Sequence, residues 1–194
     1  DPKDRFAYVT NYDSNTLSVY KVDAHSGALT AVEPAIATDV HPIFATVDFA
    51  GKFVYVANYG STTVSAYQIN QQTGVLTAIA GSPFAVGPRP YSISIEPKDH
   101  YAYVANWSDN TVTVHAFDPN TGALTPVSAS RAATGSYPYA VAVDPSGHFA
   151  YVANNGAGDI SAYTVDTSGR LHLVAGSPFA SGKGPYSLVT TTPH

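Results

Sequence analysis

One four-residue pattern, Tyr-Val-Thr/Ala-Asn, occurs four times in this chain of 194 residues and sets a single structural period. The asparagines of the pattern follow one another after 47, 48 and 48 residues, at Asn11, Asn58, Asn106 and Asn154. Two further markers keep the same period, a turn glycine at Gly27, Gly74, Gly122 and Gly169 and a proline at Pro42, Pro90, Pro138 and Pro185. Self-similarity of this kind indicates a repeat architecture. The fold must therefore be built from four equivalent units.

Each unit contains four apolar runs of strand length and no sustained helical period. In the third unit the runs cover residues 91–96, 101–106, 111–117 and 123–128, and residues that favour turns separate them. Four strands in about 48 residues is the size of a propeller blade. The second run is largely apolar on both faces, as expected where sheets are covered on both sides. The sequence predicts an all-β protein, with residues 1–194 forming a single β-propeller domain.

The two ends of the chain predict how the propeller closes. Residues 185–194 resemble the first strand of a unit, and residues 1–8 resemble the turn and second strand. We expect the last strand to close the blade begun at the N-terminus, because such pairing removes exposed sheet edges. The four four-stranded blades are then 42–89, 90–137, 138–184, and 185–194 together with 1–41. Three arrangements remain open: a four-bladed ring, half of an eight-bladed homodimer that exchanges end strands, or a piece cut from a longer protein.

Composition excludes several classes of function. Charged residues make up 12% of the chain and the net charge is −5, so we expect no nucleic-acid partner. No run approaches the roughly 18 apolar residues of a membrane span, so we expect no membrane insertion. Cysteine is absent and the histidine spacing does not fit a zinc site, so we predict neither a metal nor a cofactor. Abundant Gly, Pro and Tyr without Cys favours an extracellular, periplasmic or cell-surface protein.

The candidate site lies in the loops. In a propeller, the loop before the first strand of each blade and the loop after its second strand meet at one mouth of the central channel. The predicted ligand-binding residues in these loops are Tyr12, Asp13, Tyr59, Trp107, Asp109, Tyr137, Asn155 and Lys183. Aromatic rings are frequent binding anchors. In the same loops, His41 is a candidate general base and Arg89 a candidate cation for a developing negative charge.

The repeated Tyr-Val-Thr/Ala-Asn, with its Ser/Thr-rich turns and a strand of the Val-Ser-Ala-Tyr type, resembles the YVTN-repeat proteins. These are grouped with lactonase-like β-propellers of the 6-phosphogluconolactonase type. The stretch Gly87-Pro88-Arg89 is similar to the Gly-Pro-Arg-His of the lactonases, with Pro90 in place of the histidine. The family contains both lactone hydrolases and surface-layer or cell-envelope proteins. The resemblance therefore implies the propeller fold and leaves the function open.

Three functions follow, and the sequence favours the first. The chain is predicted to be a scaffold without catalysis, whose aromatic loop face binds a polar small molecule or a protein partner. The first alternative is a lactone hydrolase, in which Arg89 holds an anionic substrate or oxyanion and His41 or Asp13 directs water. The second is a surface-layer or excised or engineered repeat module without a ligand. The four repeated asparagines are predicted to be structural, since one occurs in every unit.

Overall fold

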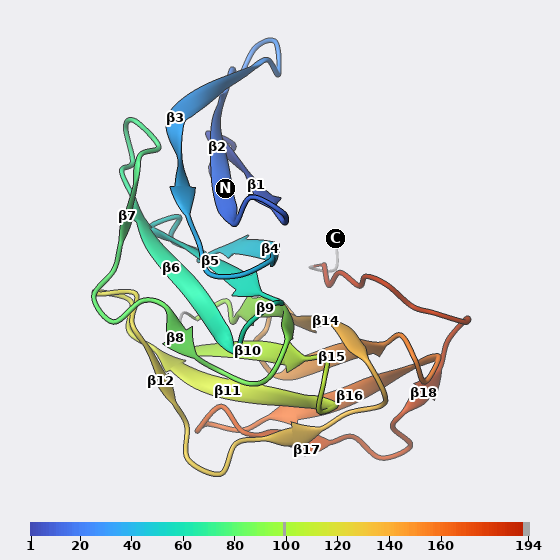
Figure 1. The fold of residues 1–194 in the computed structure, drawn as a ribbon. Helices are drawn as coiled ribbons and strands as arrows, with labels where there is room; N and C mark the ends of the chain where they lie inside the picture. The colour runs from blue at the N-terminus through green and yellow to red at the C-terminus, as the bar shows by residue number, and fades with distance from the viewer. Residues whose placement is uncertain (99, 192–194) are drawn as a thin grey trace.

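The computed structural model describes residues 1–98 and 100–191, which form eighteen strands and no helix (Figure 1). The predicted all-β class is confirmed. The strands make four antiparallel sheets, and each sheet takes all its strands from one repeat. The sheets follow one another around an arc whose inner strands face the middle of the molecule (Figure 1).

The first sheet has three strands, in the order β1 (Phe6–Asn11), β2 (Thr16–Val22) and β3 (Leu29–Ala37). The second sheet runs outward through β4 (Pro42–Val47), β5 (Phe53–Asn58), β6 (Thr63–Ile69) and β7 (Leu76–Ala78), with β8 (Phe84–Ala85) also on β6. The third has β9 (Pro90–Ile95), β10 (Tyr101–Asn106), β11 (Thr111–Phe117), β12 (Leu124–Pro126) and β13 (Ala132–Ala133). The fourth repeats this order with β14 (Pro138–Val143), β15 (Phe149–Asn154), β16 (Asp159–Val165), β17 (Leu171–Leu173) and β18 (Phe179–Ala180).

The second strand of each blade explains why the blades pack face to face. All six residues of β5 are buried. Because side chains alternate across a strand, Phe53 and Tyr55 enter a core shared with the third sheet, while Val54 and Val56 enter one shared with the first. The sequence of β5 has no polar face because each of its two faces packs against a neighbouring blade.

The turn glycine of the second, third and fourth blades receives an aromatic ring from the blade before it. Gly74, Gly122 and Gly169 have positive φ values of 79°, 75° and 77°. A Cβ added at these positions would lie 2.6, 2.6 and 2.5 Å from atoms of Phe6, Phe53 and Tyr101. The left-handed backbone and the close approach both require glycine. We call this contact the glycine–ring joint.

The outer strand of the second, third and fourth blades differs from the prediction. The expected run 123–128 is shortened to β12, and a second segment, β13, pairs with the other end of β11. Between them the chain leaves the sheet and is held by Ser130, whose hydroxyl donates to the carbonyl of Val127 at 2.6 Å. At the equivalent place in the second blade, the hydroxyl of Ser82 accepts the amide of Ala66 at 2.9 Å. In the second blade a serine hydroxyl therefore takes the place of a backbone acceptor for an amide of β6.

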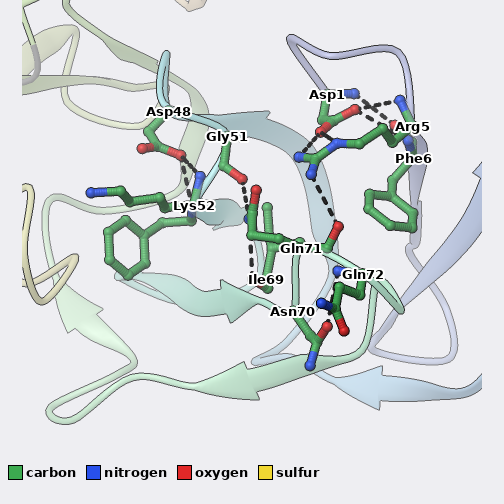
Figure 2. A network of polar contacts seen from close by, with 11 residues as sticks. Asp1, Arg5, Phe6, Asp48, Gly51, Lys52, Ile69, Asn70, Gln71 and Gln72 are labelled. Atoms are coloured by element: carbon green, nitrogen blue, oxygen red, sulfur yellow. Dashed lines mark hydrogen bonds and ion pairs between the residues drawn. The ribbon is translucent and has the colours of Figure 1, made fainter.

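The N-terminus begins within a blade, as the sequence comparison predicts. The Asp1 carboxylate accepts the backbone amides of Arg5 at 2.7 Å and Phe6 at 3.2 Å. Asp48 accepts the amides of Lys52 and Phe53 in the same way, both at 2.7 Å (Figure 2). Asp1 thus occupies the hairpin position that Asp48 occupies in the next blade.

The predicted closure by the last strand is not formed. Within the described residues, 185–191 form no strand and β1 pairs with β2 alone, so the first sheet lacks its inner strand. Residues 192–194 of the predicted closing segment lie outside the described residues. The segment stays on the blade that precedes it, where the Thr190 hydroxyl donates to the Val143 carbonyl at 2.8 Å and the Tyr186 ring meets Tyr139. Both partners lie in β14 of the adjacent fourth blade, whereas β1 belongs to the other end of the arc (Figure 1).

Candidate active site at the channel mouth

The residue before the first strand of each blade has a left-handed backbone. His41, Arg89 and Tyr137 have φ values of 52°, 52° and 55°, and each precedes the proline that begins an inner strand. For residues with bulky side chains this conformation costs about 1 to 2 kcal/mol. Side-chain carbonyls of Asn15 and Asn110 accept the amides of His41 and Tyr137, at 2.8 and 2.9 Å. The surrounding chain therefore fixes the direction of these side chains.

Backbone hydrogen bonds bring the two loops of each blade together. The amide of Tyr59 donates to the carbonyl of His41 at 2.9 Å, and that of Trp107 donates to Arg89 at 3.0 Å. Asn155 donates to Tyr137 in the same way at 2.9 Å. The loop before the first strand and the loop after the second strand thus form one rim in three successive blades.

Arg89 lies between two aromatic rings. Its guanidinium carbon is 5.5 Å from the ring centroid of Tyr59 and 5.4 Å from that of Trp107. A guanidinium at this distance from a ring is attracted by the ring quadrupole. One guanidinium nitrogen also donates to the Tyr59 hydroxyl at 3.4 Å. The Arg89 side chain is exposed to solvent, yet it is held by neighbours from two blades.

The aromatic contacts continue on both sides of Arg89. Trp107 stacks on Tyr137 with centroids 4.7 Å apart and an interplanar angle of 14°. On the other side, His41 stacks on Tyr12 at 4.3 Å and 6°. Tyr59 links the two groups, since its ring contacts Arg89 and its amide binds His41. The sequence-predicted residues Tyr12, His41, Tyr59, Arg89, Trp107 and Tyr137 therefore form one continuous row, which we call the rim row.

A second aromatic group, absent from the sequence prediction, adjoins the rim row. Tyr91 and Tyr139 stack with centroids 4.2 Å apart, and the Tyr91 and Tyr186 hydroxyls are 2.9 Å apart. Tyr59 touches Tyr91 edge to face at 5.8 Å. Burial, followed by the hydrogen bond with Tyr186, raises the pKa of Tyr91 well above its ordinary value. The Pro-Tyr pair that recurs in three repeats is the sequence feature from which this cluster could have been predicted.

Four predicted binding residues are not part of the rim row. Asp13 and Lys183 are exposed. Asp109 forms an ion pair with Arg131 and accepts the Thr111 hydroxyl at 2.7 Å. The Asn155 amide donates to the carbonyl of Pro185 at 3.3 Å. Asp109 and Asn155 therefore have structural partners within the chain.

The repeated asparagines join neighbouring strands of one blade. The Asn58 amide donates to the hydroxyls of Thr63 and Ser65, both at 3.0 Å. Asn11, Asn106 and Asn154 make the equivalent pairs of bonds across their own blades. Their amides thus bind the third strand of the blade. Their role is structural, as one residue per blade indicates.

Two negative findings apply to residues 1–98 and 100–191. No group of three or more His, Asp or Glu side chains is arranged to hold a metal ion. No helix long and apolar enough to cross a bilayer occurs there either.

Repeated antiparallel blades, joined face to face and carrying variable side chains on one rim, define a β-propeller. The sequence matches the family described as lactonase, 7-bladed beta-propeller, over residues 1–90 and again over 87–186, and the chain belongs to this family. No curated protein matches the sequence significantly.

Solved structures show the same fold. A Bacteroides uniformis protein with the provisional name 6-phosphogluconolactonase superposes with a TM-score of 0.84 at 19% identity, covering 94% of this chain and 54% of its own. The periplasmic gluconolactonase of Pseudomonas aeruginosa gives 0.78 at 22% identity, covering 94% and 53%. A Lactobacillus plantarum protein gives 0.72 at 24% identity, covering 88% and 50%. The chain thus spans about half the length of these proteins.

Proposed function

We propose that the channel mouth around Arg89 binds a sugar lactone and promotes its hydrolysis. The observation that carries this proposal is the position of the Arg89 guanidinium, which lies between the rings of Tyr59 and Trp107. The left-handed backbone at Arg89 fixes the direction in which this side chain leaves the loop. A preorganised cation at a partly apolar site stabilises negative charge that develops during a reaction. The first alternative from the sequence is therefore preferred over a scaffold without catalysis.

The reaction assigns distinct roles to two rim residues. Water adds to the lactone carbonyl carbon, and the carbonyl oxygen becomes negatively charged beside the Arg89 guanidinium. Collapse of this intermediate breaks the bond to the ring oxygen and yields the open hydroxy acid. His41 accepts the proton of the attacking water, and this proton is returned to the departing ring oxygen. The rings of Trp107 and Tyr137 offer apolar faces to the C–H groups of the sugar.

The family match and the structural neighbours also support this proposal. The family is named for lactonase activity, and one structural neighbour is a gluconolactonase. That neighbour is periplasmic, which agrees with the predicted location outside the cytoplasm or at the cell surface. Because the chain covers about half of such proteins, activity of the 194-residue chain itself is part of the proposal.

The proposal is tested with a panel of sugar lactones, whose hydrolysis releases acid that is titrated at constant pH. We expect Arg89→Ala to lower kcat/KM by about 100-fold or more, the usual effect of removing an oxyanion donor. Arg89→Lys retains the charge without the planar stacking and should retain part of the rate. Arg170→Ala, at an exposed arginine bonded to the Ser128 carbonyl, is the matched control. Equal rates for wild type and Arg89→Ala would refute the assignment.

The scaffold function remains the second candidate, favoured by the continuous row of rings from Tyr59 to Tyr137. Trp107 is the single tryptophan of the chain, so its fluorescence reports ligand binding at the rim without a label. A lactone that shifts this emission without being hydrolysed would favour binding alone. Hydrolysis that depends on Arg89 would favour the enzyme.

A further inference from the structure

We propose that the boundary between the second and third blades binds a small neutral molecule with a hydroxylated aromatic ring, in a cavity beside His115. This site is separate from the rim row, and the proposal does not depend on lactone hydrolysis. It rests on one position that differs between the repeats, and on the polar groups that this difference leaves unpaired.

The fifth residue of the third strand is a tyrosine in three blades and a histidine in the third blade. These residues are Tyr20, Tyr67, His115 and Tyr163. The hydroxyls of Tyr67 and Tyr163 each donate at 2.6 Å to a carbonyl of the preceding blade, at Ala37 and Ala133. A phenol group therefore spans the blade boundary at this position in two blades of the same molecule.

In the third blade a cavity of about 180 Å³ lies at this position. Its lining includes His115, Val114 and Val127 of the third blade and Val86 of the second. An apolar cavity of roughly 150 Å³ accepts a benzene ring. The cavity is thus large enough for one aromatic ring and has apolar side chains to pack against it. We call it the third-blade cavity.

Two polar groups at this boundary lack the partner that a tyrosine would supply. Ala85 lies opposite Thr63 as Ala133 lies opposite Thr111, so its carbonyl is the counterpart of the one that Tyr163 binds. The imidazole of His115 is 2% exposed, and one of its nitrogens has no hydrogen-bond partner among the described residues. A hydroxyl both donates and accepts, so it can pair with a carbonyl or with either tautomer of an imidazole. These groups favour an occupant that carries a hydroxyl.

The charges around the third-blade cavity favour a neutral occupant. Arg131 lines the cavity, but it forms an ion pair with Asp109, so its charge is already compensated. Burial lowers the pKa of His115 to about 4, which keeps the imidazole neutral near pH 7. A charged ligand would lose its hydration here without gaining a free partner of opposite charge. A phenol has a pKa of about 10 and enters as a neutral molecule.

The test uses p-cresol, which is the tyrosine side chain as a free molecule. Amide signals of the labelled protein are followed by NMR while p-cresol is added. We expect saturable shifts at Val86, Val114 and Val127, which line the third-blade cavity. Shifts confined to the rim row, where the fluorescence of Trp107 also reports binding, would overturn the proposal. The absence of any saturable shift would overturn it as well.

His115→Tyr tests whether the position itself creates the site. The variant carries the residue that three other blades have, and its own ring should occupy the cavity and abolish the shifts at Val86 and Val127. His25→Tyr, at an exposed histidine in the turn after β2, is the matched control and should bind p-cresol as the wild type does. Unchanged affinity in His115→Tyr would refute the site.

Toluene tests the class of ligand, because it has the shape of p-cresol without the hydroxyl. We expect it to bind about tenfold more weakly than p-cresol, although it is the more apolar molecule, because the hydrogen bond is lost. Equal or tighter binding of toluene would show that the cavity selects for apolar surface alone and would overturn the assigned ligand.

Discussion

Acidification is expected to destabilise the third blade through His115. This residue lies in β11 where the other three blades have Tyr20, Tyr67 and Tyr163, and it is 2% exposed. One ring nitrogen lies 3.2 Å from the Thr113 hydroxyl, and the other is buried without a hydrogen-bond partner. Burial lowers the pKa of His115 from 6.5 to about 4. The folded protein therefore keeps this imidazole neutral at pH values where the unfolded chain protonates it.

The magnitude follows from proton linkage. Above pH 6.5 the imidazole is neutral in both states and contributes no pH dependence. Between pH 6.5 and about 4 the unfolded chain binds the additional proton, so the free energy of unfolding falls as the pH falls. At 1.36 kcal/mol per pKa unit, the loss reaches about 3 kcal/mol near pH 4.

Urea unfolding at several pH values between 7 and 4, followed by the fluorescence of Trp107, measures this loss. The matched variant is His115→Tyr. Tyr67 and Tyr163 donate hydroxyl hydrogen bonds at 2.6 Å to the carbonyls of Ala37 and Ala133. A tyrosine at 115 should find the equivalent Ala85 and fill part of a cavity of about 180 Å³ beside it. We expect this variant to lose about 3 kcal/mol less than wild type on acidification, whereas parallel losses would refute the role of His115.

Substitutions at three further positions test the blade contacts by the same unfolding assay. Tyr55→Phe removes the hydroxyl that donates to the Gly122 carbonyl at 2.7 Å and should cost about 1 kcal/mol; no loss would mean that water replaces the bond. Gly122→Ala should cost about 2 kcal/mol or more, because φ is 75° and the methyl group meets Phe53, and a neutral result would contradict the joint. Asp48→Ala leaves the buried Phe53 amide without its acceptor and should cost about 2 kcal/mol, whereas Asp48→Asn should retain most of the stability.

The sequence predicted the inner part of each blade well because its signals are local. The runs 101–106 and 111–117 coincide with β10 and β11, since turn residues bound each apolar run at both ends. The outer strand was less predictable, because β12 is only three residues long and a serine side chain, not a strand pattern, shapes the segment that follows. The position of 185–191 depends on contacts with β14, about 47 residues earlier in the chain, which no local pattern encodes.

In the candidate site, too, some features could be predicted from the sequence and others depend on contacts between distant segments. Topology predicted that Tyr59, Arg89 and Trp107 would lie on one rim, and the structure places them in contact. The pairing of Asp109 with Arg131 was not predictable, because it depends on how the outer segment folds back toward β11. The left-handed backbone of Arg89 also escaped detection, since the residue type gives no indication of it.

That left-handed backbone has an evolutionary consequence. At His41, Arg89 and Tyr137 the amide and carbonyl are held by hydrogen bonds, so the conformation does not depend on which side chain is attached. A basic imidazole, a permanent cation and a phenol occupy the same backbone position in three blades of one molecule. Mutation can therefore exchange the chemistry at each position separately while the buried cores between blades are unchanged. A repeat protein of this design can acquire a new specificity through single substitutions, without passing through unstable intermediates.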